Sequence, residues 1–397
     1  MQTVILAAGR GTRMGPLTES TPKPMLPIAD RPLAAHVADA AVDAGATRLV
    51  FVVGYRGEAV RSYFGDSYRG VPVEYAEQDE QRGTADAVAA ARASLAAEKF
   101  AVLNGDVLLD AESLSELFAV DAGIGCTRVE DPTSYGVLAV TDENVVTDVV
   151  EKPADPPSDL INAGAYVFPP DALNWLDVPE SDRGERELTD VLERCIRELD
   201  VRAVPLDEWL DVGRPWELLA ANERRIAALD ARIDGDVSSD ATIEGDVVVE
   251  KGATVREGVT IEGPALVRSG ASVGPNAYVR GVTLLGEDAS VGHAVEVKNS
   301  VLRAGATVGH QSYVGDSVLG QDVNFGAGTQ VANLRHDDEP VRVTVKGDRV
   351  STGRRKFGVV VGDDVKTGIN TSLNAGVTLG SGLWTEPGER VRTDRTE

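Results

Sequence analysis

Branched aliphatic residues recur at every sixth position through the second half of the chain, and small residues often stand two places before them. This period is typical of a parallel β-helix, in which each six-residue side buries one aliphatic side chain and three sides close a coil. The run is too regular for chance alternation in an ordinary β-sandwich. The repeated positions are Ile243, Val249, Val255, Ile261, Val267, Val273, Val279, Leu285, Val291 and Val297, then, after a one-residue slip, Leu302, Val308, Val314, Leu319, Phe325 and Val331, and finally Val361, Thr367, Leu373 and Leu379.

The first 210 residues follow another pattern, in which short runs of β-branched and aliphatic residues alternate with segments of helical character. Residues 3–6, 49–53 and 101–103 are predicted as buried parallel strands, and residues 32–44 and 85–97 as helices. This alternation predicts an open α/β, Rossmann-like domain with a mostly parallel sheet. Ligands of such sheets bind beyond the carboxyl ends of the strands.

The change of period sets the expected domain boundaries. We expect the α/β domain over residues 1–225, the end of a linker helix over 226–235, and the β-helix over 236–397. The helix that connects the two is predicted from Trp216 to Ile233. Residues 334–357 interrupt the repeats, so we expect an insertion there.

Charge and composition narrow the classes of function. The formal net charge of −25 repels phosphate backbones and argues against general nucleic-acid binding. No run approaches the roughly 20 apolar residues of a membrane span, the N-terminus does not resemble a signal peptide, and Cys126 and Cys195 are too few for a disulfide framework. We therefore expect a cytoplasmic protein without a membrane partner. Only 8 of the 39 basic residues are lysines, which suggests a cell with a salty interior.

The first predicted strand runs into a glycine-rich turn with candidate phosphate-binding chemistry. Glycine lets the backbone approach phosphate closely, and the amide groups that follow can surround it. The spacing of Gly9, Gly11 and Gly15 fits neither a Walker loop nor a dinucleotide fingerprint. By itself the turn is equally well explained as structural. Lys23 follows nearby, between two prolines that restrict its backbone.

The stretch Leu6–Pro27 resembles the signature of sugar-1-phosphate nucleotidyltransferases, and further motifs follow in that family's order through the first 225 residues. Each has an ordinary alternative, such as a helix cap for Asp106, a solvated pair for Glu151 and Lys152, or a turn for Asp211. Their occurrence together is highly specific. The motifs are Gln78 with Gly83-Thr84, Asn104-Gly105-Asp106, Tyr135-Gly136, Glu151-Lys152-Pro153, Asn162-Ala163-Gly164 and Trp209-Leu210-Asp211.

The resemblance implies that a sugar phosphate attacks the α-phosphorus of a nucleoside triphosphate and releases pyrophosphate, a reaction that depends on positioning and electrostatics. Arg13 would hold the leaving phosphates and Lys23 the transferring one. Mg²⁺, which prefers oxygen ligands, would be bound by Asp106 and Asp211. The implied nucleotide-binding residues are Ala8, Gly9, Gly11, Thr12, Arg13, Gln78, Gly83 and Thr84, and the implied sugar-phosphate-binding residues are Gly136, Glu151, Lys152 and Asn162.

The choice of nucleotide and sugar stays open. The sequence Leu-Ala-Ala-Gly over residues 6–9, together with Met14, favours a uridylyltransferase that uses UTP and N-acetylglucosamine 1-phosphate. The context Trp-x-Asp-x-Gly around Asp211 is closer to glucose-1-phosphate thymidylyltransferases.

The β-helix half carries a second set of polar residues. His310, Tyr313, Asn324 and Asn333, with Arg280 and Lys298 at matching spacing, resemble the acetyltransferase half of bifunctional glucosamine-1-phosphate acetyltransferase / N-acetylglucosamine-1-phosphate uridylyltransferases. The resemblance implies a left-handed β-helix, usually trimeric, with sites between subunits. An unperturbed imidazole titrates near pH ~6.5, so His310 suits the base in transfer from acetyl-CoA to an amino sugar. Arg280 and Lys298 would bind the sugar phosphate, while Tyr313, Asn324 and Asn333 would orient the amino sugar.

The sequence departs from the bacterial members of that family after Asn333, because no lysine follows until Lys346. The insertion at 334–357 resembles archaeal two-domain relatives. Its Arg354, Arg355 and Lys356 can bind coenzyme A phosphates or a neighbouring subunit, and a solvated loop is an equally good interpretation. Our preferred hypothesis is a bifunctional enzyme. The alternatives are a monofunctional glucose-1-phosphate uridylyl- or thymidylyltransferase with a structural β-helix, and a non-enzymatic regulatory subunit.

Overall fold

The computed structural model describes residues 1–181 and 183–396, which form two compact units. The first unit comprises residues 1–10, 22–26 and 32–211. The second comprises residues 11–21, 27–31 and 212 onward, so two short N-terminal segments belong to the same unit as the C-terminal half. The domain boundaries at residues 225 and 235 stay predictions. No helix in the described part of the chain is long and apolar enough to cross a membrane.

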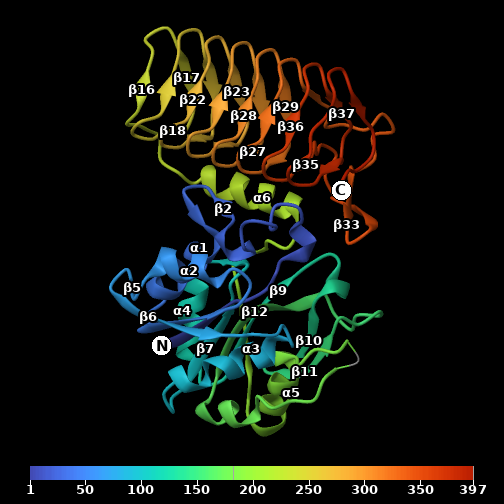
Figure 1. Ribbon diagram of the computed structural model, residues 1–397. Coiled ribbons are helices and arrows are strands. Elements are labelled where there is room, and N and C mark those ends of the chain that lie inside the picture. The colour runs from blue at the N-terminus through green and yellow to red at the C-terminus, as the bar shows by residue number, and fades with distance from the viewer. Residues whose placement is uncertain (182, 397) are drawn as a thin grey trace. The chain divides into compact units, whose positions relative to one another are not determined.

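The first unit contains a ten-stranded mixed sheet in the order β11-β10-β12-β7-β1-β4-β6-β5, with β9 between β12 and β13 (Figure 1). Strands β7, β1, β4 and β6 are parallel, which confirms the three strands predicted from apolar runs. β8 and β14 form a separate antiparallel pair. The strands are β1 Gln2–Ala7, β2 Pro27–Ile28, β3 Arg31–Pro32, β4 Arg48–Val53, β5 Ser67–Tyr68, β6 Val71–Glu77, β7 Phe100–Asn104, β8 Val107–Leu109, β9 Gly123–Arg128, β10 Gly136–Val140, β11 Val146–Glu151, β12 Leu160–Phe168, β13 Arg202–Pro205 and β14 Trp209–Asp211.

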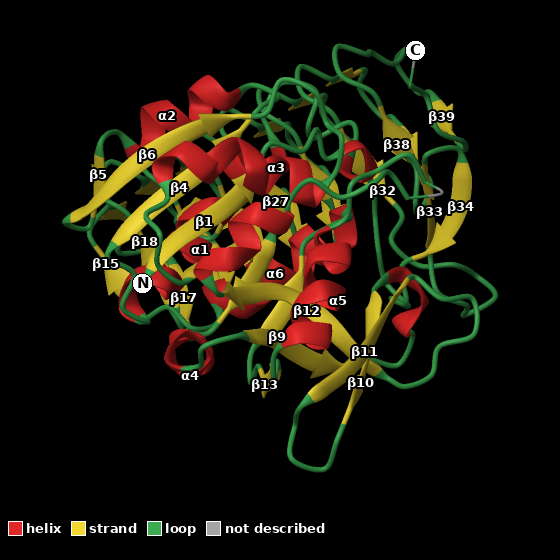
Figure 2. Ribbon diagram, turned by 90° about the horizontal axis from the view of Figure 1, so that it is seen from below, coloured by secondary structure: helices red, strands yellow, loops and turns green. Residues whose placement is uncertain are grey.

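Helices cover both faces of this sheet (Figure 2). Alternate residues of the central strands point to opposite faces, so Val4 and Val102 pack with α3 and α5, while Ile5 and Leu103 pack with α1, α2 and α4. The helix predicted over 85–97 is shorter, because α3 ends at Ala90, a 3-10 helix continues over Ala91–Ser94, and the backbone is extended from Leu95. The helices are α1 Leu33–Asp43, α2 Gly57–Phe64, α3 Thr84–Ala90, α4 Ala111–Ala119 and α5 Leu188–Glu198.

The second unit contains three parallel sheets, as the predicted left-handed β-helix requires (Figure 1). Each aliphatic residue of the six-residue repeat from Val249 to Val331 is buried in one continuous core. The first sheet has β15 Arg232–Ile233, β18 Val247–Val249, β21 Ala265–Val267, β24 Thr283–Leu285, β27 Val301–Leu302, β30 Val318–Leu319, β35 Val360–Val361 and β38 Thr378–Leu379. The second has β16 Asp236–Val237, β19 Thr254–Val255, β22 Ser272–Val273, β25 Ser290–Val291, β28 Thr307–Val308, β31 Asn324–Phe325 and β36 Lys366–Thr367. The third has β17 Thr242–Glu244, β20 Thr260–Glu262, β23 Tyr278–Arg280, β26 Glu296–Lys298, β29 Tyr313–Gly315, β32 Gln330–Val331, β37 Ser372–Leu373 and β39 Arg390–Val391.

The insertion leaves and rejoins the β-helix at one place. Leu334 and Lys356 form an isolated antiparallel bridge, and Phe357 donates its amide to the carbonyl of Asn333. Between them, β33 Arg342–Val345 and β34 Asp348–Ser351 pair as a hairpin. Because β30 pairs directly with β35, the coil continues as if residues 334–357 were absent.

The predicted connecting helix ends earlier than expected. Helix α6 spans Pro215–Ile226, not Trp216–Ile233. Ile233 instead belongs to β15, whose pairing with β18 begins the first coil of the β-helix. The prediction was wrong at this end because Ile233 serves as a strand residue of the following domain, although it continues the helical pattern of the sequence.

Candidate active sites

Residues at the carboxyl ends of the parallel strands form the first candidate site. Ala8 follows β1 and Gln78 follows β6. Asp106 follows β7, with Gly105 between the strand and Asp106. A Cβ atom at Gly105 would lie 2.5 Å from the carbonyl oxygen of Leu6, so only glycine lets this turn approach β1 so closely. The edge of the sheet therefore carries the residues that the sequence predicted there.

Lys23 and Asp106 form a short ion pair in this site. The Nζ atom of Lys23 lies 2.5 Å from Oδ2 of Asp106, and Lys23 is 7% exposed. Asp211 ends β14 and stands opposite Val107 of β8, which places it beside the residue that follows Asp106. Asp106 is not a helix cap, because Asp110 caps α4 by accepting from the amide of Ser113. The strand register thus brings the backbone of Asp211 next to the turn that carries Asp106.

The carboxylate pair fits Mg²⁺ in number and chemistry. Asp106 already holds a cation, the ammonium of Lys23, and a carboxylate oxygen is a ligand that Mg²⁺ prefers. No group of three or more histidine, cysteine or acidic residues that could hold a metal occurs among residues 1–181 and 183–396. Mg²⁺ is often bound by one or two carboxylates and completed by phosphates and water, and Asp106 and Asp211 supply that number.

The glycine-rich segment itself belongs to the second unit from Gly11 onward. Gly11 adopts a left-handed conformation (φ 65°) and begins the short 3-10 helix Thr12–Met14. Its carbonyl accepts from the hydroxyl of Thr18 at 3.0 Å, which closes the segment on itself. The side chain of Met14 is buried, whereas Thr12 and Arg13 are exposed. The exposed pair is therefore available to a ligand.

Gln78, Gly83 and Thr84 lie together at the start of α3. The Nε2 atom of Gln78 donates to the carbonyl of Gly83 at 3.1 Å and to Asp86 at 2.9 Å, while Thr84 accepts from the amide of Leu188. A Cβ atom at Gly83 would collide with the main chain of Arg186. Since both amide protons of Gln78 are used, its carbonyl oxygen is the group that can recognise an N–H donor.

Gly136, Glu151 and Asn162 also meet. Gly136 stands opposite Glu151 in the β10–β11 pair, and a Cβ atom at Gly136 would lie 3.1 Å from Glu151 Oε2 and 3.5 Å from Asn162. Lys152 lies 3.3 Å from Glu151, and the side chain of Arg183, which the sequence did not single out, lies 3.4 Å from the same carboxylate. Glu151 therefore belongs to a charged group and not to a simple solvated pair.

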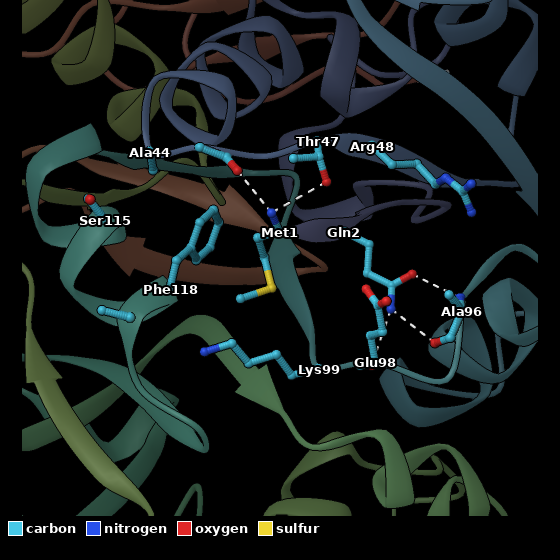
Figure 3. Close-up of a pocket in the computed structure, with 12 residues that line it drawn as sticks. Met1, Gln2, Ala44, Thr47, Arg48, Ala96, Glu98, Lys99, Ser115 and Phe118 are labelled. Atoms are coloured by element: carbon cyan, nitrogen blue, oxygen red, sulfur yellow. Dashed lines mark hydrogen bonds between the residues drawn. The ribbon is translucent and has the colours of Figure 1, made fainter.

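A cavity of about 720 Å³ lies at the opposite edge of the same sheet (Figure 3). It is lined by the amino ends of β1 and β4, at Met1, Gln2 and Arg48, and by Lys99 and Phe118. The motif residues follow the carboxyl ends of the strands, so this cavity does not coincide with the candidate site.

The second candidate site centres on Asp316, a residue that the sequence did not point to. Its buried carboxylate accepts from Lys298 Nζ at 2.8 Å, from Asn333 at 2.5 Å and from Asn299 at 3.0 Å. Asn333 also donates to the hydroxyl of Tyr313 at 3.1 Å. Burial raises the pKa of the Tyr313 hydroxyl, which keeps it protonated as a hydrogen-bond donor. Two predicted site residues, Lys298 and Asn333, are thus held by one carboxylate, and Asn333 in turn binds the third, Tyr313.

Arg280 and His310 flank this group on the β-helix. Arg280 stands beside Lys298 in the register of β23 and β26, and it lies 2.7 Å from Glu296. His310 is exposed at a corner before Tyr313, and its Nδ1 accepts from the amide of His293 at 3.2 Å. A neutral ring in this arrangement carries its proton on Nε2. A base role for Nε2 therefore requires the ring to turn and release that amide.

Asn324 lies on a different sheet from Arg280, Lys298 and Tyr313. It is exposed on β31, which belongs to the second of the three sheets, whereas Arg280, Lys298 and Tyr313 stand on the third. Asn324 pairs with Thr307 and Lys366 in neighbouring coils. Within one chain these positions do not bring Asn324 to the group around Asp316.

The insertion is a folded element and not a solvated loop. Both terminal nitrogens of Arg354 form an ion pair with the carboxylate of Glu223 in α6, and the distance from Arg354 Nη1 to Glu223 Oε2 is 3.0 Å. The same carboxylate accepts a hydrogen bond from Asn299 at 2.8 Å. Arg349 donates to the carbonyl of Gly376. Because Asn299 also binds Asp316, the insertion is linked by hydrogen bonds to the group that contains Lys298.

Each half of the chain matches a known protein-family model. The family model for nucleotidyl transferases matches residues 2–227, more than half of the chain. The chain belongs to the nucleotidyl transferase family. A second model, the GMPPB C-terminal domain, matches residues 261–383.

Two relatives of this nucleotidyl transferase match nearly its full length. The bifunctional protein GlmU of Methanocaldococcus jannaschii is 40% identical over 97% of this chain and 93% of its own. The bifunctional sugar-1-phosphate nucleotidylyltransferase/acetyltransferase of Sulfurisphaera tokodaii is 36% identical over 99% and 98%. A solved UDP-glucose pyrophosphorylase in complex with UDP-glucose is 26% identical, with a TM-score of 0.52, over 56% of this chain and 97% of its own. The two-domain organisation is thus that of bifunctional nucleotidylyltransferase/acetyltransferase enzymes.

Proposed function

We propose that the chain acetylates glucosamine 1-phosphate with acetyl-CoA in its β-helix and converts N-acetylglucosamine 1-phosphate with UTP to UDP-N-acetylglucosamine in its α/β domain. The observation that carries this proposal is the polar group around Asp316, where Lys298, Tyr313 and Asn333 are held together on a β-helix that needs none of them for its core. The relative from Sulfurisphaera tokodaii, which is similar over the full length, carries both activities in its name, and the one from Methanocaldococcus jannaschii is named as bifunctional.

In nucleotidyl transfer, an oxygen of the sugar phosphate forms a bond to the α-phosphorus of UTP, and the bond from that phosphorus to the pyrophosphate oxygen breaks. Arg13 and Lys23 bind the phosphates and oppose the negative charge of the transition state. Asp106 and Asp211 hold Mg²⁺, which neutralises phosphate charge when bound. The carbonyl oxygen of Gln78 accepts from the imide N–H of the base. Uracil and thymine share that group, so Gln78 does not select between UTP and dTTP.

In acetyl transfer, the amine of the sugar forms a bond to the thioester carbon, the carbon–sulfur bond breaks and coenzyme A leaves as the thiol. His310, once its ring has released the amide of His293, accepts a proton from the amine. Arg280 and Lys298 bind the sugar phosphate, and Tyr313 and Asn333 orient the amino sugar. The chain forms a homotrimer through the β-helix in the cytoplasm. Asn324 acts on the site of a neighbouring subunit, which is consistent with its position on another sheet than Lys298 and Tyr313.

A pair of variants tests the two activities separately. His310→Ala should abolish acetyl transfer and leave pyrophosphate release near the wild-type rate, while Asp106→Asn should do the reverse. Each triphosphate is assayed with glucose, glucosamine and N-acetylhexosamine 1-phosphates, with and without acetyl-CoA. Wild-type protein that acetylates no amino-sugar phosphate would leave the chain a monofunctional nucleotidyltransferase. Sedimentation at several concentrations tests the trimer.

A further inference from the structure

A buried arginine of the β-helix binds the glycine-rich segment of the nucleotidyltransferase signature. Arg303 follows β27 and is 1% exposed. Its Nη1 lies 3.0 Å from Oδ1 of Asp363, which is also buried. A charged pair in the interior is costly unless further hydrogen bonds satisfy it, so the partners of this pair are informative. Burial lowers the pKa of Arg303, and the carboxylate of Asp363 opposes that shift.

The neighbouring coils make room for this pair. The residues that follow the matching strands β24 and β30 are both glycines, Gly286 and Gly320. A Cβ atom at Gly320 would lie 2.5 Å from the carboxylate of Asp363, and one at Gly286 would lie 2.7 Å from the main chain of Arg303. The corner of the β-helix is thus shaped around Arg303 and Asp363.

Asp363 accepts one hydrogen bond from within the β-helix, from the amide of Gln321, and further bonds of the pair go to residues 11–21, which belong to the same compact unit. Arg303 donates to the carbonyl of Leu17 at 3.2 Å and to the hydroxyl of Thr21 at 2.5 Å. The hydroxyl of Ser20 donates to Asp363. Together with the bond from Thr18 to Gly11, these contacts fix both ends of the segment that carries Arg13.

We infer that Arg303 and Asp363 are positioning residues for nucleotidyl transfer, acting through the phosphate-binding segment 11–21. The inference rests on the proposed nucleotidyltransferase function. Arg13 lies inside the segment that the pair holds, and Lys23 follows Thr21 by two residues. A displacement of about 1 Å in such a segment can lower a rate by ~100-fold. Loss of the pair therefore affects nucleotidyl transfer, although Arg303 lies in the sequence of the acetyltransferase half.

The test uses full-length protein and both assays. Arg303→Met should lower kcat/KM for pyrophosphate release at least tenfold and raise the KM for UTP, with kcat/KM for acetyl transfer within twofold of wild type. Arg303→Lys, which keeps the charge but not the fork of donors, should recover part of the loss. Arg268→Met is the matched control. Arg268 occupies the corresponding position after β21 and binds Glu250 and Glu287 of the β-helix instead, so its loss should leave both activities within twofold of wild type.

Thr21→Val removes the hydroxyl that Arg303 binds and leaves the β-helix unchanged. The test therefore still works if Arg303→Met does not fold. Thr21→Val should lower kcat/KM for pyrophosphate release several-fold with acetyl transfer unchanged. Folded Arg303→Met or Thr21→Val protein with wild-type nucleotidyl transfer would overturn the inference, and so would equal loss of both activities in Thr21→Val. Wild-type protein without pyrophosphate release would instead overturn the proposed function, so the two failures are distinguishable.

Discussion

Substitution of Asp316 by asparagine removes the charge of the proposed acetyltransferase centre and nearly preserves its shape. Asp316 has a left-handed backbone (φ 52°), which asparagine adopts readily, so the change adds little backbone strain. The carboxylate accepts from Lys298, Asn299 and Asn333, whereas a carboxamide has one acceptor oxygen and would turn an N–H₂ group toward one of these donors. Breaking a buried ion pair by removing one charge costs about 3–5 kcal/mol. The side chain of Lys298 is 16% exposed and can turn to water, so we expect about 3 kcal/mol.

The effect on acetyl transfer should be visible in the enzyme that remains folded. Lys298 and Asn333 share the Oδ2 atom of Asp316, so an N–H₂ group in its place removes the acceptor that orients both. Misplacement of such groups by about 1 Å lowers rates by ~100-fold. Acetyl transfer is followed by thiol release, pyrophosphate release serves as the internal control, and urea unfolding gives the free energy. Asp322→Asn is the matched control, because Asp322 is exposed at another corner with φ 53°. Folded Asp316→Asn enzyme with more than a third of wild-type acetyl transfer would refute the reasoning.

Three further expectations concern the core, a glycine and the thiols. Phe325→Ala removes a fully buried ring from the β-helix and should lower the free energy of unfolding by about 3–5 kcal/mol, measured by urea denaturation; a loss below 1 kcal/mol would mean that this coil is not a continuous core. Gly83→Ala should raise the KM for UTP, because the new Cβ meets the main chain of Arg186, while Gly70→Ala, which also has a positive φ but open space, should not. Burial raises the pKa of Cys126 to about 11 and of Cys195 to about 12. An unfolded thiol ionises near pH ~8.5, so the stability contributed by the two protonated thiols is complete below that pH and is lost as pH rises toward the folded values. Urea midpoints at pH 7.5 and 10 should differ less once both cysteines are replaced by alanine.

The periodic parts of the fold could be predicted from the sequence because their physical requirement is local. Each aliphatic residue of the six-residue repeat fills one side of a coil, and the slip after Val297 is absorbed without a break in the core. The same reasoning failed at Ile233, because one residue can satisfy a helical pattern and begin a strand. The end of α6 depends on the pairing of β15 with β18, and a pattern of neighbouring residues carries no information about that pairing.

The candidate sites could be predicted only in part. Motif residues such as Asp106 and Gln78 follow strands, and parallel strands bring their carboxyl ends to one edge, so the sequence order implies proximity. Asp316 and Arg303 carry no such signal. Each sits at a corner of the repeat, where polar residues are ordinary, and its importance depends on burial by segments distant in sequence. Arg183 likewise reaches Glu151 through a fold that no spacing reveals.

The segments of the two units alternate along the N-terminal sequence, with changes after Arg10, Thr21, Leu26 and Arg31. A cut near residue 225 would therefore not yield two self-sufficient pieces, since the first would keep residues 11–21 without the surface that holds them. Gene fusion or exchange of the C-terminal half between relatives should succeed only when the N-terminal signature and the matching β-helix corner are inherited together.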